Sequence, residues 1–389
     1  MDDDRLSQGA YPEGVPNAMP LEIRLFAGCH RRIQCPVRVP YHENATPPAL
    51  VCQGHGVHVQ RDGDFLTFMP LSMGPYAEAV YRPTGALPPT EVTLTDRCDR
   101  VDVLVAGEEL TTYWYRDVPA RPYFWPLLSD GGIPVTRAFP MRTDVPGETT
   151  DHKHHRSLTF AFGSVNGVDN WSEEPGHGHT RHRSIDEITS GPVFGRLKTT
   201  GEWTDAADKP LLTQKLTATF WHVGGGFRLM DFELQLIATH GDVLFGDTKE
   251  GGMISVRVAS CMDVTSGGRI ENSYGAIDEE ETWGRAAQWC DYSGPAGTRQ
   301  VGIAIMDHPE SFRYPTYWHV RDYGLFAANP FALSEYTQGT KDGSHLLRSG
   351  QSLRFHYRVM VHHGSATDAN VRGHYLNFLT PPRAEVAVR

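Results

Sequence analysis

Long apolar runs are missing from this sequence, which offers no stretch of about 18 apolar residues for a membrane-spanning helix. A signal-peptide pattern is also missing, because residues 1–5 are largely acidic and no apolar segment follows them. Both absences favour a cytoplasmic protein that has no membrane partner. Cysteine is scarce, with 6 among 389 residues. No two cysteines form a CxxC pair, so we expect free thiols.

The common catalytic signatures GxGxxG, GxxxxGK[ST], GxSxG and HExxH do not occur. Their absence disfavours dinucleotide-binding, P-loop, serine-hydrolase and zincin classes. A formal net charge of −11 and the lack of a basic stripe disfavour a nucleic acid partner.

Strand patterns dominate what is present. The chain has 39 glycines and 27 prolines that separate short runs of alternating apolar residues. Residues 212–220 and 227–237 alternate on either side of three glycines, which predicts a hairpin. Residues 352–361 predict a strand with one polar face. No repeat of 20–50 residues and no amphipathic helix beyond about 10 residues is evident. We therefore predict an all-β fold, a large antiparallel β-sandwich.

The predicted organisation has four parts. Residues 1–20 are polar and lack periodicity, which is typical of an N-terminal arm. Residues 21–101 read as a β-rich segment packed on the main domain, residues 102–365 as that main sandwich domain, and residues 366–389 as a C-terminal tail.

The most unusual feature is a His-rich stretch, residues 151–156, with the sequence DHKHHR. Burying so many polar groups is costly without partners, which favours a functional role over a satisfied core cluster. On an extended chain His152 and His154 share one face, and His155 joins them only if the chain bends. Imidazole can transfer protons near neutral pH or bind a metal. The neighbouring cluster of His177, His179 and His182 reads as a separate loop, either solvated or contributing to a lid or metal.

Three later segments place charges among turn residues. Residues 245–252 present Asp247, Lys249 and Glu250 between glycines, where backbone can approach a ligand closely. Asp307 and His308 follow a predicted strand. Tyr317, His319 and Arg321 share one face of another, ahead of Asn329. Aromatic rings beside polar groups suit sugar binding as well as an ordinary core.

Together these segments resemble the bacterial PmoA-like family, a group of unknown function often labelled methane oxygenase PmoA. The resemblance spans roughly residues 102–365. It implies a fold similar to the galactose-mutarotase supersandwich and a setting in sugar metabolism. Membrane methane oxidation is excluded, because no membrane span is present. The matching segments are residues 121–126, 151–156, 165–169, 245–252, 283–294, 307–309 and 316–331.

Three functions remain open. The first is an enzyme that acts on a small carbohydrate or keto-sugar by acid–base chemistry, through hydrolysis, elimination or epimerisation, with no required cofactor. The second is a metal-dependent enzyme that uses the His-rich site and a divalent ion, and the third is a carbohydrate-binding protein without catalysis. A homo-oligomer is compatible with all three. The predicted catalytic residues are His152, His155, Glu250, Asp307 and His319. The predicted substrate-binding residues are Arg156, Asn166, Trp171, Lys249, His308, Tyr317, Arg321 and Asn329.

Overall fold

The computed structural model describes residues 21–388, which form two compact units. Residues 21–89 and 382–388 belong to the smaller unit, and Thr90–Pro381 form the larger one. The predicted arm at residues 1–20 lies outside the described residues. Within them, no helix is long and apolar enough to cross a membrane. All six cysteines are free, and three of them are buried.

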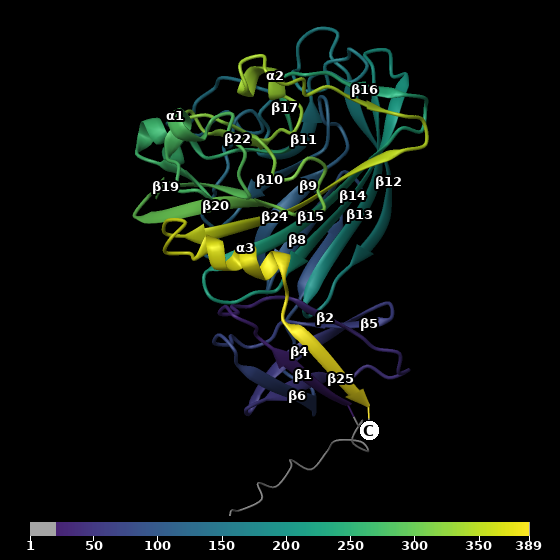
Figure 1. Ribbon diagram of the computed structural model, residues 1–389, viewed down its shortest axis with the longest axis vertical. Coiled ribbons are helices and arrows are strands. Elements are labelled where there is room, and N and C mark those ends of the chain that lie inside the picture. Colours follow the sequence, from purple (N-terminus) through teal and green to yellow (C-terminus); the bar gives the residue numbers. More distant parts are fainter. Residues whose placement is uncertain (1–20, 389) are drawn as a thin grey trace, which may run out of the picture. The chain divides into compact units, whose positions relative to one another are not determined.

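The smaller unit is built on one seven-stranded antiparallel sheet in the order β2-β5-β4-β3-β6-β1-β25 (Figure 1). Its last strand comes from the end of the chain, where a tail was expected. The strand forms because Ala384 and Val386 alternate with polar residues and pack against the core of this unit. The strands are β1 (Leu21–Phe26), β2 (Val37–Pro40), β3 (Ala49–Cys52), β4 (His55–Asp62), β5 (Phe65–Phe68), β6 (Glu78–Thr84) and β25 (Arg383–Val388).

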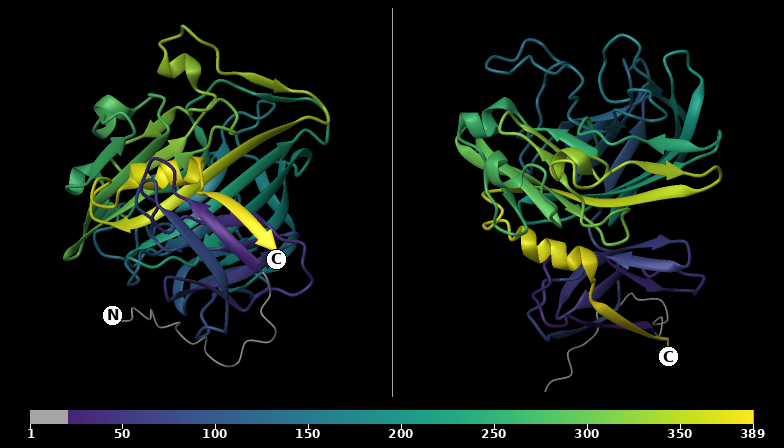
Figure 2. Two further views of the ribbon diagram at one scale, coloured as in Figure 1. Left: turned by 60° about the horizontal axis from the view of Figure 1, so that its bottom comes forward. Right: turned by 45° about the horizontal axis from the view of Figure 1, so that its top comes forward.

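The larger unit contains two eight-stranded antiparallel sheets that pack face to face (Figure 2). Phe124 of the first sheet lies 6.2 Å from Phe220 and 5.3 Å from Phe232 of the second, measured between ring centroids. These rings belong to one large apolar cluster drawn from both sheets. The all-β class and the antiparallel sandwich are therefore confirmed.

The first sheet has the order β21-β22-β17-β11-β10-β9-β8-β7, and the second has the order β12-β13-β14-β15-β24-β20-β19-β18. The strands of the first are β7 (Val92–Asp96), β8 (Arg100–Val105), β9 (Glu108–Trp114), β10 (Tyr123–Leu127), β11 (Leu158–Phe162), β17 (Gly251–Arg257), β21 (Trp318–Val320) and β22 (Leu325–Ala328). Those of the second are β12 (His179–Thr189), β13 (Phe194–Thr204), β14 (Pro210–Trp221), β15 (Phe227–Ile237), β18 (Arg269–Asn272), β19 (Trp289–Ala296), β20 (Arg299–Asp307) and β24 (Ser352–His363). A small pair is formed by β16 (Val243–Phe245) and β23 (His345–Leu347).

The predicted hairpin is confirmed, since β14 and β15 pair antiparallel with Trp221 opposite Leu229. The predicted strand with one polar face is β24, in which Phe355, Tyr357 and Val359 enter the core. The larger unit begins one strand earlier than the expected residue 102, because Val92 and Leu94 of β7 are buried in its core.

Helices are few and short in the described range. They are η1 (Ser260–Met262), η2 (Val264–Ser266), α1 (Asp278–Thr282), α2 (Leu333–Tyr336) and α3 (Val371–Leu379). The longest, α3, packs Phe378 against His356 and Arg358 of β24. It therefore covers part of the outer face of the second sheet.

Candidate functional site

The outer face of the first sheet carries a row of small and polar side chains. Thr159, Ser255, Ala327 and His319 pair in turn across β11, β17, β22 and β21. The next row, from Leu158 through Val256 and Phe326 to Val320, belongs to the apolar core. Because side chains alternate along a strand, the His319 row points away from that core.

The His-rich stretch lies at one end of this face as a turn that leads into β11. His155 N–H donates to the His152 carbonyl at 3.0 Å, and His152 and Ser157 have positive φ values of 42° and 50°. The chain therefore bends where an extended chain would place His155 on the opposite side. As a result the His152 and His155 rings stack with centroids 4.8 Å apart and planes 2° from parallel.

Asp151 anchors the turn to two buried arginines. Its Oδ1 accepts from Arg137 at 2.6 Å and from Arg257 at 2.8 Å, and these arginine side chains are 0% and 1% exposed. Burial alone would raise the pKa of Asp151. The hydrogen bond to His152 and the charges of Arg257 and Arg137 outweigh it and lower the pKa to about 2.

The other Asp151 oxygen holds the His152 ring. Oδ2 lies 2.5 Å from His152 Nδ1, and the His152 side chain is 42% exposed. An anionic carboxylate at Nδ1 favours the tautomer with a proton on that nitrogen, which leaves a lone pair on Nε2. His155 is nearly fully buried, and Arg257 donates to its Nδ1 at 3.2 Å. Burial lowers the pKa of His155 well below its usual value, so its ring is neutral at pH 7.

The loop that carries Trp171 lies against the His-rich stretch. Asp169 accepts from the backbone of Trp171 and Ser172, at 2.7 and 3.0 Å, and fixes the turn. The Trp171 ring lies 5.3 Å from His155. Its indole N–H is buried and has no hydrogen-bond partner among residues 21–388. Arg156, a predicted substrate binder, is bound by Glu173 at 2.7 and 2.8 Å and anchors this loop.

Tyr323, in the turn between β21 and β22, links the His-rich stretch to the later segments. Its ring stacks on His152 at 5.1 Å and 5°, and Arg257 and Arg321 lie 4.8 and 5.4 Å from the ring centroid. Burial raises the pKa of the Tyr323 hydroxyl.

His319 occupies the opposite part of the face and is 3% exposed. Burial, with the charge of Arg321, lowers its pKa to about 4, so the ring is neutral. The Lys249 backbone lies close to the ring, but neither ring nitrogen meets the geometry of a hydrogen bond to any described residue. Asn329 donates to the Thr248 and Lys249 carbonyls at 3.0 and 3.1 Å and so positions this loop.

Gly163 allows β11 to meet the same loop. Its N–H donates to the Glu250 carbonyl at 2.8 Å, and a Cβ there would lie 2.7 Å from that oxygen. Lys249 pairs with Glu335 at 3.3 Å, while Glu250 is half-exposed. Ring contacts join His152, His155 and Trp171, and Tyr323 connects His152 to Arg321. His319 lies in the strand β21 just before Arg321, and Lys249 and Glu250 lie in the loop that meets β11 at Gly163. We call these seven residues, His152, His155, Trp171, Lys249, Glu250, His319 and Arg321, the outer-face cluster.

Other predicted residues lie elsewhere. Asn166 is exposed and accepts from Leu244 N–H at 2.7 Å, beside β16. Tyr317 stacks on Tyr336 at 5.7 Å. Asp307 and His308 belong to β20 and the turn after it, in the second sheet, and their contacts in the described range do not include the His-rich stretch.

Asp307 instead faces the core opposite Tyr357, where it is 0% exposed. One oxygen accepts from Thr316 N–H at 2.9 Å, and the other has no partner among residues 21–388. Burial raises the pKa of Asp307 to about 7.

A stability prediction follows from Asp307. The folded carboxyl keeps its proton up to about pH 7, whereas the unfolded one ionises near its ordinary pKa of 3.8. The stabilisation that comes from the raised pKa of Asp307 is therefore fully present at low pH. As pH rises from about 4 to 7, the free energy of unfolding falls by up to about 4 kcal/mol. Asp307→Asn should remove this loss and be the more stable form at pH 8. Urea unfolding at pH 5 and pH 8 tests this, and equal pH profiles of the two proteins would contradict it.

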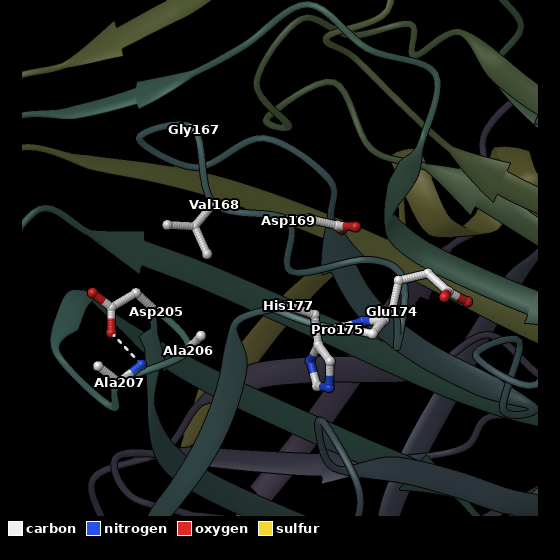
Figure 3. A pocket seen from close by; sticks show the side chains of 10 residues that line it. Gly167, Val168, Asp169, Glu174, Pro175, His177, Asp205, Ala206 and Ala207 are labelled. Atoms are coloured by element: carbon white, nitrogen blue, oxygen red, sulfur yellow. Dashed lines mark hydrogen bonds between the residues drawn. The ribbon is translucent and has the colours of Figure 1, made fainter.

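A separate hollow of about 380 Å³ lies beyond the Trp171 loop, lined by Asp169, Glu174, His177 and Asp205 among others (Figure 3). None of the predicted catalytic residues lines it. The predicted loop at residues 177–182 is wrong beyond His177, because β12 begins at His179. His182 packs on Tyr115 at 4.4 Å, and that apolar contact holds the segment as a strand.

Sequence reasoning did not single out Arg137, Arg257 and Tyr323 as site residues. Arg257 carried one usable signal, since it is the only charged residue of β17 and closes an otherwise uncharged strand. Arg137 and Tyr323 carried none, because their roles depend on contacts between segments distant in sequence.

Fold and site together define a β-sandwich protein with a polar cluster on the outer face of one sheet. Residues 100–375 match the family of unknown function DUF6807, and the chain belongs to that family. The expected assignment to a PmoA-like family is therefore wrong. The family whose model matches is DUF6807.

No curated protein matches the chain. Solved structures with some similarity include a glycosyl hydrolase family 38 protein from Enterococcus faecalis, at 10% identity and TM-score 0.40, covering 95% of this chain and 47% of that one. An alpha-mannosidase from Enterococcus faecalis V583 has 10% identity and TM-score 0.42, covering 96% and 46%. This chain thus spans about half the length of both proteins.

A GalM/aldose epimerase homologue from C. elegans has 10% identity and TM-score 0.29, covering 70% of this chain and 98% of that one. With every TM-score below 0.5, these similarities assign neither activity nor substrate to this chain.

Proposed function

We propose that the protein is a carbohydrate-active enzyme that binds a sugar or keto-sugar at the outer-face cluster and transfers a proton through His152. The observation that carries the proposal is the Asp151–His152 pair at 2.5 Å, near the Trp171 ring, whose buried indole N–H has no protein partner in the described range. This combination supplies a proton carrier and a polar surface in one place.

Buried polar groups are nearly always hydrogen-bonded, so unpartnered ones call for a ligand or water. Both nitrogens of His319 and the Trp171 indole N–H are of this kind among residues 21–388. Sugar hydroxyls can donate and accept, which matches a neutral imidazole and an indole donor. Tyr323 and Trp171 add aromatic surface, on which the C–H faces of a sugar pack.

The chemistry centres on His152. Asp151 is fixed by Arg137 and Arg257, holds the ring orientation, and stabilises the imidazolium that forms when Nε2 takes a proton. Arg321 pairs with Glu279 at 2.8 Å and lies 5.4 Å from the Tyr323 ring centroid, and its guanidinium supplies positive charge for an enolate-like oxygen. Removal of a proton next to a carbonyl, as in epimerisation or elimination, fits this set of groups better than hydrolysis. Glu250, 51% exposed, would complete the set as the second acid–base group.

Proton exchange tests the proposal even when the product is unknown. Aldoses and keto-sugars are incubated with the protein in D₂O, and loss of C–H signals is followed by ¹H NMR. We expect one substrate class to exchange or turn over, and His152→Gln to slow this by about 10²–10⁴-fold, the usual range for an acid–base group.

His177→Gln is the matched control, because His177 lines the separate hollow of Figure 3 and should leave the rate unchanged. Sugar binding without exchange in the wild type would favour the non-catalytic carbohydrate-binding alternative. Exchange that survives His152→Gln would reject the proposed role of His152.

A further inference from the structure

The outer face of the second sheet carries a polar row that the proposed function does not use. Thr217 pairs with Glu233 on β14 and β15, and Glu233 pairs with His356 on β24. The adjacent Leu234 and Phe355 are core residues. By alternation, Glu233 and His356 therefore point outward. This is the polar face that the sequence predicted for β24.

Three potential metal ligands meet at this row. One ligand atom each from His308, Glu310 and His356 lies within 4.8 Å of the other two. No other group of three or more such residues occurs in the described part of the chain. The two imidazole rings have centroids 4.8 Å apart. The predicted His-rich metal site at residues 152–155 forms no such group.

The backbone holds the two histidines in place. His308 N–H donates to the His356 carbonyl at 3.0 Å, and His356 N–H donates to Ser311 Oγ at 2.9 Å. Phe378 of α3 lies 5.0 Å from the His308 ring and 4.8 Å from the His356 ring, covering one side of the pair. A fixed pair with an apolar cover is typical of a preorganised site rather than of two freely moving surface side chains.

The nitrogen of His308 that faces Glu310 is in the form that binds metals. His308 Nδ1 accepts from Glu310 N–H at 3.2 Å and lies 3.8 Å from Glu310 Oε2. The Nδ1 lone pair is the group that a metal ligand supplies, so an ion bound at this nitrogen would replace the hydrogen bond from Glu310 N–H.

We propose that His308, His356 and Glu310 form a binding site for a divalent transition-metal ion of the zinc class. Two imidazoles and one carboxylate suit Zn²⁺, whose bonds of about 2.1 Å place tetrahedral ligand atoms roughly 3.4 Å apart. The three ligand atoms now lie within 4.8 Å of one another, and rotation of Glu310, whose side chain is 82% exposed, can shorten its distances to the two imidazoles.

Such an ion would have room for a fourth ligand. A pocket of about 520 Å³ is lined by Glu310, His356, Glu233, Gln235 and Arg354, among others. Three protein ligands beside an open space are characteristic of catalytic zinc sites, in which water or substrate takes the last position. Glu233, directly beside His356 in the sheet, is placed to bind that water. This inference is independent of the proposed sugar site on the other sheet.

Zinc titration of the untagged full-length protein, stripped with chelator and desalted, tests the site by calorimetry. We expect one equivalent of Zn²⁺ to bind, and Co²⁺ substitution to give the visible absorption of a low-coordinate site. Glu310→Gln and His356→Ala should each weaken Zn²⁺ binding at least about tenfold, since even indirect partners of metal ligands contribute 10–100-fold.

His152→Ala is the matched control for the other histidine cluster and should leave the affinity unchanged. Because Glu310 is exposed, Glu310→Gln should fold even if His356→Ala does not. The absence of stoichiometric binding, or binding that is lost with His152 and retained in Glu310→Gln, would overturn the proposal.

Discussion

Asp151→Ala is expected to lower the free energy of unfolding by about 2–4 kcal/mol. The change leaves Arg137 and Arg257, which are 0% and 1% exposed, without the carboxylate that both contact. Breaking a fully buried ion pair costs about 3–5 kcal/mol, and the value here is smaller because Asp151 is itself 40% exposed. Urea denaturation at pH 7 measures the loss.

Asp144→Ala is the matched control, because Asp144 pairs with Arg142 at 3.2 Å but both side chains are well exposed. Exposed pairs contribute about 0–1 kcal/mol, so this variant should stay close to the wild type. Equal, small effects of the two substitutions would show that Asp151 does not anchor the His-rich turn.

His319→Leu should weaken sugar binding at least about tenfold, while leaving the free energy of unfolding equal to or above that of the wild type. The ring is buried but makes no hydrogen bond within the described residues, so an apolar side chain of similar size removes a desolvation cost. A buried polar residue that lowers the stability of the fold is expected in a functional site, where binding requires a group that the fold alone would not favour.

His362→Leu is the matched comparison in the second sheet. His362 Nε2 lies 2.6 Å from Asp291 Oδ2, and both side chains are 1% exposed. Its loss should cost about 3–5 kcal/mol, because Asp291 is left as an unpaired buried charge. Thermal melts of both variants compare the two losses of stability. If His319→Leu is as unstable as His362→Leu, His319 is a structural residue and the proposed role in binding is wrong.

Local sequence patterns were enough to predict the class of fold. The predicted alternation of apolar and polar residues corresponds to real strands at β14, β15 and β24, because each of these strands has one face in a shared core. The C-terminal strand β25 was missed, because its partner β1 lies more than 350 residues earlier and nothing local indicates the pairing.

The candidate site was predictable only where a local pattern of residues indicated it. The His-rich stretch was visible as an unusual concentration of polar groups, and the proposed convergence of His152 and His155 required a bend that the structure has. The two arginines on Asp151 come from residues 14 and 106 positions away, which no local pattern reveals. Asp307 was predicted for the site, but its place in the alternation of β20 turns it toward the core.

The polar face of β24 was predicted as a feature of a half-buried strand and carried no functional meaning in the sequence. Only the register with β15 and the turn after β20 brings His308, Glu310 and His356 together. Metal-ligand spacing along the chain therefore could not indicate this group.

A high-resolution crystal structure of the protein soaked with the sugar that exchanges in D₂O tests the central claim most directly. We predict that the sugar lies beside His152, whose side chain is 42% exposed, and the Tyr323 ring that stacks on it, with hydroxyls bonded to His319 and Trp171 and a reacting carbon next to His152 Nε2. A sugar found only in the hollow of Figure 3, or one that makes no contact with His152, would contradict this prediction.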